Sequence, residues 1–346
     1  MKKVIDKLYN QKSLSKDEFI YLLDNIDDKN SEYLFSLARE RRKEFYGNDI
    51  YIRGLIEFTN YCKNDCYYCG IRCSNSKTER YRLSKEDILN CAEEGYKLGF
   101  RTFVLQGGED PYFTDERMVE IISSLKERYP DCALTLSVGE KSYESYKKYF
   151  DAGADRYLLR HESADGEHYS KLHPKDLSLD NRKRCLYDLK KIGYQVGTGI
   201  MVGSPYQNSA NVADDLIFIK KLNPHMVGIG PFIPHKDTPF RDKDKGSLKL
   251  TLILLGIIRL MIPPVLLPST TALSTIDKEG REKGILAGAN VIMPNLSPVS
   301  VREKYMLYDN KANTGQEAAE SLEILKNSMK KIGYDIVSDR GDSLVK

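Results

Sequence analysis

The chain carries almost no excess charge and has no long uninterrupted apolar run. Its 53 Lys and Arg side chains nearly balance 50 Asp and Glu side chains, which leaves a net charge of +3. This balance gives no support for a nucleic acid or a membrane surface as partner. The apolar stretch from Leu252 to Pro268 is interrupted by Arg259 and by prolines, and the charged N-terminus, Met1 to Lys7, lacks the apolar core of a signal peptide. We therefore expect a cytoplasmic protein without a membrane span.

Cysteine is too scarce for a disulfide framework. Only seven cysteines occur, none follows Cys185, and four lie between residues 62 and 73. In a reduced protein, such crowding indicates a metal site. The isolated Cys91, Cys132 and Cys185 are interpreted as buried thiols.

Short runs rich in β-branched and aromatic residues recur after residue 48, and each is followed by an amphipathic stretch. Eight such runs are present, at residues 51–58, 102–106, 133–138, 156–160, 195–201, 226–230, 265–268 and 289–293. Eight strand and helix units predict one parallel (β/α)8 barrel of the TIM type. An incomplete six-stranded barrel is the alternative, because residues 250–268 are apolar enough to suit either a strand or a helix.

Both ends of the chain have helical periodicity. Residues 1–48 are predicted to form a helical extension packed on the barrel, which itself takes residues 49–310. Residues 311–346 are predicted to form a C-terminal helix, at 316–332, and a polar tail that is mobile from residue 338. No low-complexity linker divides the chain, so we expect one domain.

Three closely spaced cysteines follow the first expected strand. Cys62, Cys66 and Cys69 have the spacing C-x3-C-x2-C on a polar loop, at the strand end where barrel enzymes place their active sites. Soft thiolates favour an iron-sulfur cluster or zinc, and three ligands leave one iron of a four-iron cluster open. The alternative is a zinc site with Cys73 as the fourth ligand, which four thiolates within so short a segment fit poorly.

Polar residues also follow the second and fourth expected strands. Two glycines in the segment Gln106-Gly107-Gly108-Glu109 allow close backbone approach to a ligand, and Glu109 suits an ammonium group. Glu162 suits ribose hydroxyls, and Arg182 suits a carboxylate. Arg53 and Arg156 lie within strand patterns, so they either face solvent or line a polar cavity that binds an anion.

At this cysteine spacing the sequence resembles the radical S-adenosylmethionine superfamily. The resemblance implies that Cys62, Cys66 and Cys69 hold a 4Fe-4S cluster, whose open iron takes the amino and carboxylate groups of S-adenosylmethionine. Electron transfer would then cleave the sulfonium to methionine and a 5′-deoxyadenosyl radical. The resemblance further implies that Tyr68 packs near the adenine and that Gly107, Gly108 and Glu109 meet the methionyl amino group.

Longer stretches are similar to one family, the FeFe-hydrogenase maturase HydE, a relative of biotin synthase and methylornithine synthase. They lie at residues 56–58, 68–72, 106–112, 135–137, 139–140, 156–162, 226–235, 237–239, 270–272 and 288–295. The resemblance therefore extends from the first expected strand to the eighth.

This second resemblance implies further site residues. The residues implied for S-adenosylmethionine are Gln106, Thr135, Glu162, Arg182 and Met226. Those implied for the substrate cavity are Arg53, Arg156, Arg160, Thr270, Thr271, Met293 and Tyr305. The implied substrate is a small organometallic iron complex with cysteine, carbon monoxide and cyanide ligands, delivered by another hydrogenase maturase, and the adenosyl radical would attack its cysteine sulfur. An electron donor is also implied.

One departure and two alternatives remain. Some family members carry a second cluster on C-terminal cysteines, which this chain lacks, so we expect a single cluster. The nearest alternative is another radical enzyme of the biotin synthase group, such as one that makes methylornithine. The alternative from a different class is a non-catalytic metal protein, either a zinc-stabilised barrel or a cluster carrier.

Overall fold

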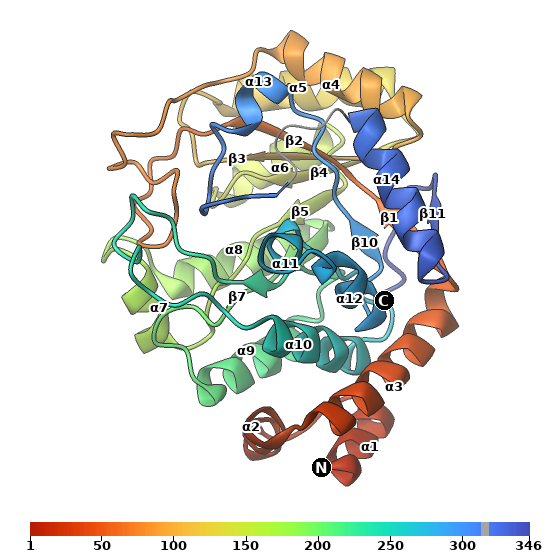
Figure 1. The fold of residues 1–346 in the computed structure, drawn as a ribbon. Coiled ribbons are helices and arrows are strands. Elements are labelled where there is room, and N and C mark those ends of the chain that lie inside the picture. Colours follow the sequence, from red (N-terminus) through yellow and green to blue (C-terminus); the bar gives the residue numbers. More distant parts are fainter. Residues whose placement is uncertain (313–317) are drawn as a thin grey trace.

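Three N-terminal helices pack on the outside of the barrel. The computed structural model describes residues 1–312 and 318–346 (Figure 1). The chain begins with α1 (Lys2–Gln11), α2 (Lys16–Asn25) and α3 (Asp28–Tyr46). The Ser15 hydroxyl accepts a hydrogen bond from the backbone N–H of Glu18, which caps α2. α2 lies against α9 (Ser209–Leu222), and α3 lies against α10 (Leu248–Met261).

Parallel strands close into a ring. The six-stranded sheet runs in the order β2 (Gly54–Thr59), β3 (Thr102–Gly107), β4 (Ala133–Ser137), β5 (Arg156–Leu158), β6 (Gln195–Thr198) and β8 (Met226–Val227). Bridges from Met226 to Leu266 and from Pro268 to Val291 continue the ring to β10 (Val291–Ile292). β10 pairs with β1 (Asp49–Ile52), which leads into β2 after the single residue Arg53. The predicted (β/α)8 barrel of TIM type is confirmed, and the six-stranded alternative is wrong.

The seventh strand position differs from the other seven. Residues 265–268 contribute only isolated bridges, and the apolar residues before them form α10. Ser247 caps this helix by accepting a hydrogen bond from the N–H of Leu250, and Pro263 and Pro264 follow its end. α10 is buried on nearly every side, so its apolar pattern has no polar face to distinguish helix from strand.

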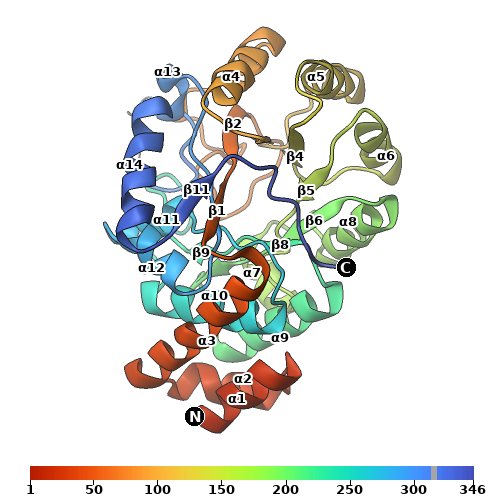
Figure 2. The ribbon, with the colours of Figure 1, turned by 90° about the vertical axis from the view of Figure 1, so that its right-hand side faces the viewer.

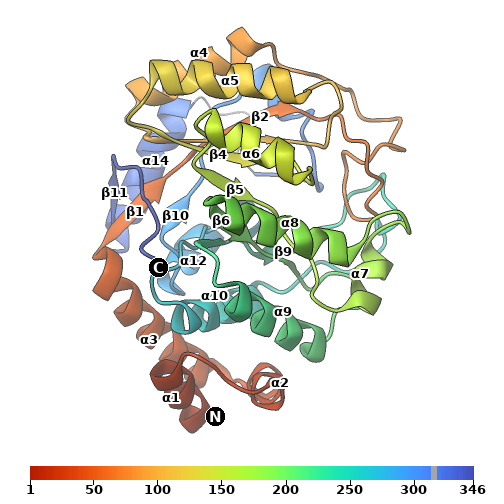
Figure 3. The ribbon, with the colours of Figure 1, turned by 180° about the vertical axis from the view of Figure 1, so that it is seen from behind.

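The remaining helices surround the strands, as Figure 2 shows from one side and Figure 3 from behind. They are α4 (Lys85–Lys97), α5 (Asp115–Arg128), α6 (Tyr143–Asp151), α7 (Gly166–Leu172), α8 (Leu179–Ile192), α11 (Thr271–Ile276), α12 (Gly280–Leu286) and α13 (Val299–Arg302). Two short strands, β7 (Met201–Val202) and β9 (Gly230–Pro231), pair beyond β6 and β8. Among the described residues, no helix combines the length and the apolar character needed to cross a bilayer.

The C-terminal segment adds a strand and covers the amino-terminal end of the barrel. α14 (Ala318–Lys331) leads into β11 (Asp335–Val337), which pairs with β1 in parallel. The first residues of the expected helix, 316 and 317, lie outside the described residues. The tail from residue 338, which was expected to be mobile, makes hydrogen bonds with the barrel: Thr102 Oγ1 donates to the Arg340 carbonyl (2.8 Å), and Ser338 Oγ donates to that of Gly99 (2.6 Å).

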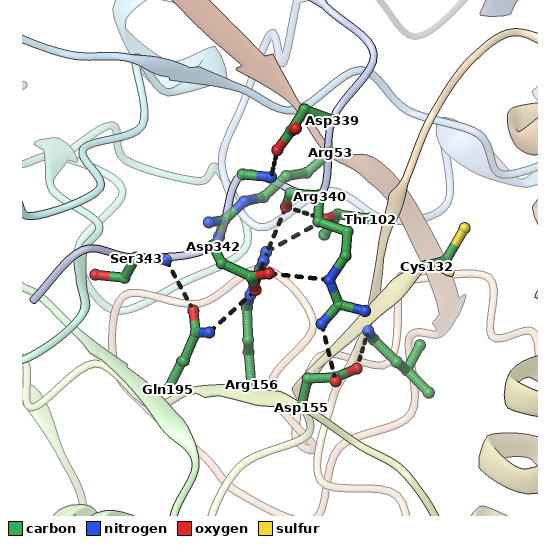
Figure 4. Close-up of polar contacts among 12 residues, drawn as sticks. Arg53, Thr102, Cys132, Asp155, Arg156, Gln195, Asp339, Arg340, Asp342 and Ser343 are labelled. Carbon is green, nitrogen blue, oxygen red and sulfur yellow. Dashed lines mark hydrogen bonds and ion pairs between the residues drawn. The ribbon is translucent and has the colours of Figure 1, made fainter. Parts of the chain in front are cut away.

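A polar network fixes this tail (Figure 4). Arg156 Nη2 donates to the Arg340 carbonyl (2.8 Å) and to Asp342 Oδ1 (2.6 Å). Asp342 also accepts from Arg340 Nε (3.0 Å) and from Gln195 Nε2 (3.0 Å). Arg156 is 1% exposed, so the tail supplies the carboxylate that a buried guanidinium requires.

Candidate active site

A cavity of about 350 Å³ opens at the carboxyl ends of the barrel strands. The cysteine loop after β2 forms one part of its wall, with Cys62, Cys66 and Cys69, and the loop after β3 forms another. Residues near the ends of β5, β9 and β10 complete it. Fifteen of the residues singled out from the sequence line this cavity: Cys62, Cys66, Tyr68, Cys69, Gln106, Gly107, Gly108, Glu109, Arg160, Glu162, Arg182, Thr270, Thr271, Met293 and Tyr305.

The cysteine loop is held by ion pairs and backbone hydrogen bonds. Arg72 Nε donates to Asp65 Oδ1 (2.7 Å), and its Nη2 donates to the other oxygen, which makes a bidentate pair across the loop. The backbone N–H of Lys63 donates to the Glu109 carbonyl (2.9 Å), and that of Gly70 donates to the Leu307 carbonyl (2.9 Å). These bonds join the cysteine loop to the loop after β3 and to the segment after α13.

Gly108 allows two of these loops to touch. A Cβ atom at this position would lie 2.1 Å from the Tyr61 carbonyl oxygen and 2.7 Å from the Cys62 Cβ atom. Backbone cannot yield to such a contact as a flexible side chain can. The glycine that the sequence suggested for close approach to a ligand therefore also brings its loop against the cysteine loop.

The three cysteines suit a bulky cluster better than a single ion. All seven cysteines are free thiols, and within the described part of the chain no group of His, Cys, Asp and Glu side chains is tight enough to hold one metal ion. A four-iron cluster holds its ligands farther apart. Burial, with the charge of Cys62 added, raises the pKa of Cys69 to about 12, and burial also raises that of Cys66. Bound iron would reverse these shifts by stabilising the thiolates. Three sulfur donors that line one cavity are soft ligands of the kind that an iron-sulfur cluster takes.

The other cysteines stand apart from this group. Cys73 is exposed and does not line the cavity, so the geometry gives no support to a zinc site with Cys73 as the fourth ligand. Cys91, Cys132 and Cys185 are buried, as expected from the sequence.

Glu109 presents a buried carboxylate to the cavity. Its side chain is 7% exposed, and Oε1 accepts a hydrogen bond from the backbone N–H of Glu140 (2.9 Å). It lies against Gly139, whose φ of +77° and lack of a side chain leave the necessary space, since a Cβ atom there would lie 2.0 Å from the Glu109 Cγ atom. Lys63 Nζ forms an ion pair with Glu109 Oε2 at 3.4 Å. This carboxylate retains capacity for an incoming ammonium.

Glu162 is held in a conformation that non-glycine residues seldom adopt. Its φ is +63°, its residue exposure is 7%, and its Oε2 atom has no hydrogen-bond partner among the described residues. Strained backbone and an unpaired buried oxygen together indicate a ligand-binding residue. Arg182, which also lines the cavity, forms an ion pair with Glu140 (2.7 Å).

Arg160 after β5, Thr270 at the start of α11 and Met293 after β10 also line the cavity. Arg160 Nε donates to the Gly228 carbonyl (3.1 Å), which orients the guanidinium, and the Thr270 hydroxyl is buried without a partner in the described structure. Gln106 Nε2 donates to the Tyr305 hydroxyl (3.4 Å). A cation and an unpaired hydroxyl suit an anionic or polar substrate.

Four expected site residues do not line this cavity: Arg53, Thr135, Arg156 and Met226. Arg156 and Met226 are the first residues of β5 and β8, so they lie toward the amino-terminal end, whereas Arg160 lies beyond the carboxyl end of β5. Arg53 Nη1 contacts Met226 Sδ (2.7 Å). Both arginines are 1% exposed, which excludes the solvent-facing interpretation.

The sequence did not single out an ion pair in the cavity wall. Glu57 and Lys311 pair with 1% and 8% exposed side chains, and Asn295 Nδ2 donates to Glu57 Oε2 (2.7 Å). A charge within the apolar strand Ile56-Glu57-Phe58 was a usable signal for Glu57. No local sequence pattern pointed to Lys311, because its partner lies 254 residues away.

Comparison with known proteins agrees with this geometry. Residues 56–219 match the profile of the Radical SAM superfamily. The [FeFe] hydrogenase maturase subunit HydE of Thermotoga maritima is 45% identical over 288 residues, which cover 83% of this chain and 82% of that protein. The 3-methylornithine synthase of Methanosarcina barkeri is 32% identical over 309 residues, covering 88% and 86%.

Solved structures agree on the fold. The crystal structure of methylornithine synthase (PylB) aligns with a TM-score of 0.83 at 27% identity, covering 96% of this chain and 97% of that one. That of the maturase HydG aligns with a TM-score of 0.80 at 24% identity, covering 96% and 74%. Cysteine loop, barrel and overall identity lead to the same conclusion: the chain is a radical S-adenosylmethionine enzyme and belongs to the [FeFe] hydrogenase maturase HydE family.

Proposed function

We propose that the chain acts in assembly of the FeFe-hydrogenase H-cluster by radical attack on the sulfur of a cysteine-bound organometallic iron complex. One observation carries the proposal. The three cysteine thiols and the Arg160, Thr270 and Met293 group face the same cavity, so a bound cofactor and a polar substrate would share one enclosed space.

Cys62, Cys66 and Cys69 would hold a single 4Fe-4S cluster. When bound, the reduced cluster would supply one electron to the sulfonium of S-adenosylmethionine, whose cleavage would give methionine and a 5′-deoxyadenosyl radical. Glu109 would accept the methionyl ammonium, Arg182 would hold its carboxylate, and Glu162 would accept the ribose hydroxyls with its unpaired oxygen.

Other residues that line the same cavity would hold the substrate. Arg160 supplies a cation for an anionic iron complex, and the buried Thr270 hydroxyl donates to it. Thr271, Met293 and Tyr305 complete this group. Other hydrogenase maturases would deliver the substrate or receive the product, and an external donor would reduce the cluster.

The proposal is tested by anaerobic reconstitution with iron and sulfide, followed by electron paramagnetic resonance with and without S-adenosylmethionine and by an assay for deoxyadenosine. We expect a 4Fe-4S signal that the cofactor changes, and deoxyadenosine in the reduced sample. Cys66→Ser should abolish both, whereas Cys73→Ser, at the exposed thiol of the same loop, should retain them. Zinc alone, or iron without deoxyadenosine, would favour a non-catalytic metal protein.

A second candidate is an enzyme of the methylornithine synthase type. It is favoured by the 32% identity to 3-methylornithine synthase and by the superposition on PylB. Activation of a hydrogenase in a maturation assay that depends on this chain would support the HydE role. Formation of 3-methylornithine, followed by mass spectrometry, would support the alternative.

A further inference from the structure

One carboxylate of α9 is buried in apolar surroundings. Asp215 is 0% exposed, and the other buried residues of this helix are all apolar. Its Oδ2 atom has no hydrogen-bond partner among the described residues. Burying a carboxylate in this way costs free energy unless its remaining contacts offset the loss of water. The contacts of its other oxygen atom therefore indicate what Asp215 does.

Asp215 Oδ1 contacts the chain on both sides of Glu162. It accepts a hydrogen bond from the backbone N–H of Ala164 (2.5 Å). It also lies 3.3 Å from His161 Nε2, which is close enough for an ion pair with a protonated imidazole but is not aligned as a hydrogen bond. The His161 ring is 0% exposed and is fixed from its other side, where Nδ1 lies 2.8 Å from Thr198 Oγ1.

The segment between these two contacts is a tight and strained turn. The backbone N–H of Ser163 donates to the His161 carbonyl (2.8 Å), and Glu162, the residue between them, has a φ of +63°. A hydrogen bond that closes over one residue of positive φ is typical of the rare, strained form of γ-turn. Such strain persists only where the surrounding contacts over-determine the conformation. The Asp215 carboxylate supplies such a contact, because it binds the N–H of Ala164 directly after the turn.

The turn directs the Glu162 side chain to the cavity, which His161, Ala164 and Asp215 do not line. Glu162 Oε2 has no partner among the described residues, and Oε1 lies 3.9 Å from Arg160 Nη1, too far for a hydrogen bond. The position of this carboxylate therefore depends on the backbone of the turn and little on contacts of its own.

We propose that Asp215 is a positioning residue that clamps the turn and so holds the Glu162 carboxylate in place for the ribose hydroxyls of the cofactor. The proposal deepens the proposed function and rests on its assignment of Glu162 to the ribose. A carboxylate that is already in place accepts these hydroxyls without a further loss of conformational freedom. Asp215 does not touch the cofactor and acts only through Glu162.

The test measures how strongly the protein prefers a complete ribose. Anaerobically reconstituted protein saturated with methionine is titrated by calorimetry with 5′-deoxyadenosine and with 2′,5′-dideoxyadenosine, which lacks the 2′-hydroxyl. The wild type should bind the first about tenfold more tightly, because the second loses a hydrogen bond to a charged carboxylate. Asp215→Ala should reduce this preference by about two- to tenfold, since one side chain must then be ordered on binding. A protein that is merely destabilised would keep the preference.

A double-mutant cycle shows whether Asp215 acts through Glu162. Glu162→Ala should abolish the preference for the complete ribose, and Asp215→Ala should change it no further in that background. The matched control is Asp155→Ala, which deletes a carboxylate that accepts the backbone N–H of Leu134 (2.8 Å) and does not line the cavity. This control should keep the wild-type preference.

The outcomes separate this proposal from the proposed function. If Asp215→Ala lowers the preference only when Glu162 is present, the proposal holds. An unchanged preference in Asp215→Ala, or an equal fall with and without Glu162, overturns it and leaves the ribose assignment intact. A wild type that binds both nucleosides equally, or neither, overturns that assignment and this proposal with it.

A measurement on the wild type keeps the proposal testable if Asp215→Ala does not fold. Amide hydrogen exchange of reconstituted protein, with and without S-adenosylmethionine, reports whether the turn is formed before the cofactor binds. We expect the Ala164 amide to exchange slowly in both samples. Fast exchange that slows only after the cofactor is added overturns the proposal, because the turn would then form on binding.

Discussion

Glu57 and Lys311 form an ion pair inside the wall of the cavity, although 254 residues separate them in sequence. Lys311 Nζ also donates to the Tyr305 carbonyl (3.3 Å), and Asn295 donates to the second carboxylate oxygen. The pair thus joins β2, the segment after β10 and the segment after α13 around the site. Its two charges nearly cancel, so it adds little net charge to the cavity.

Replacing one partner of this pair should destabilise the protein strongly. Lys311→Met leaves the Glu57 carboxylate buried without a counter-charge, and we expect a loss of about 3–5 kcal/mol in the free energy of unfolding. The double variant Glu57→Gln with Lys311→Met should recover much of that loss, because no buried charge remains. Urea unfolding of the three proteins measures the difference. Equal stability of wild type and Lys311→Met would show that water reaches the pair.

A methyl group at position 108 should prevent the cysteine loop from packing against the loop after β3. Gly108→Ala would place Cβ 2.1 Å from the Tyr61 carbonyl oxygen, so the cysteine loop must shift. We expect a clear fall in iron and sulfide bound per chain after anaerobic reconstitution. The matched control is Gly166→Ala, where nothing lies within 4 Å of the added atom. Full iron content in Gly108→Ala would contradict the close approach of the two loops.

The sequence was sufficient for the barrel and for placing the cysteine loop at the carboxyl end of the first strand, because both depend on local patterns. Repeated apolar strands followed by amphipathic helices predict the (β/α)8 ring, and the spacing of Cys62, Cys66 and Cys69 is contained within one loop. The same reasoning was weaker at residues 265–268, where two bridges replace a regular strand. The spacing of apolar residues shows which side of an element is buried. In this region nearly every side chain is buried, so the spacing does not distinguish a helix from a strand.

Features that depend on distant residues were not predictable. The sequence left open whether Arg156 faces solvent or lines a polar cavity. Its counter-ion in the structure is Asp342, in a polar tail that was expected to be mobile. Arg156 is the first residue of β5, and Arg160 lies only four residues later, beyond the end of that strand. Nevertheless, Arg156 faces the tail and Arg160 faces the cavity. Sequence spacing alone does not give the depth of a side chain within a barrel.

Removing the tail carboxylate should weaken the protein through Arg156. Asp342→Ala deletes hydrogen bonds from Arg156, Arg340 and Gln195, and we expect a loss of about 1–3 kcal/mol, toward the lower value because the Asp342 side chain is 43% exposed. Asp242→Ala, at an exposed ion pair with Arg241, is the control and should change stability little. Urea unfolding at neutral pH compares them.

The contribution of Asp342 should also depend on pH. Burial alone would raise the pKa of this carboxyl, but hydrogen bonds from Arg340 and Arg156 outweigh burial and hold it well below its ordinary value. A carboxyl with a depressed folded-state pKa stabilises the fold above its unfolded pKa of about 4, and that stabilisation is lost as the pH falls toward the folded value. The stability gap between wild type and Asp342→Ala should therefore narrow below about pH 4. A gap that widens on acidification would contradict the assignment.

His173 should make the cluster-free protein less stable as the pH falls below neutrality. Burial lowers its pKa to about 3 in the folded protein, whereas the unfolded chain binds a proton near pH 6.5. Between these values only the unfolded state is protonated, so wild type should lose up to about 1.4 kcal/mol per pH unit relative to His173→Phe. Burial also lowers the pKa values of His168 and His225, but their contributions are common to both proteins and cancel. Urea unfolding at pH 7.5 and pH 5 gives the comparison. If the free energies of unfolding of the two proteins changed in parallel with pH, His173 would become protonated in the folded state. A protonated Nε2 could not accept a hydrogen bond from the Tyr68 hydroxyl, which lies 3.2 Å away.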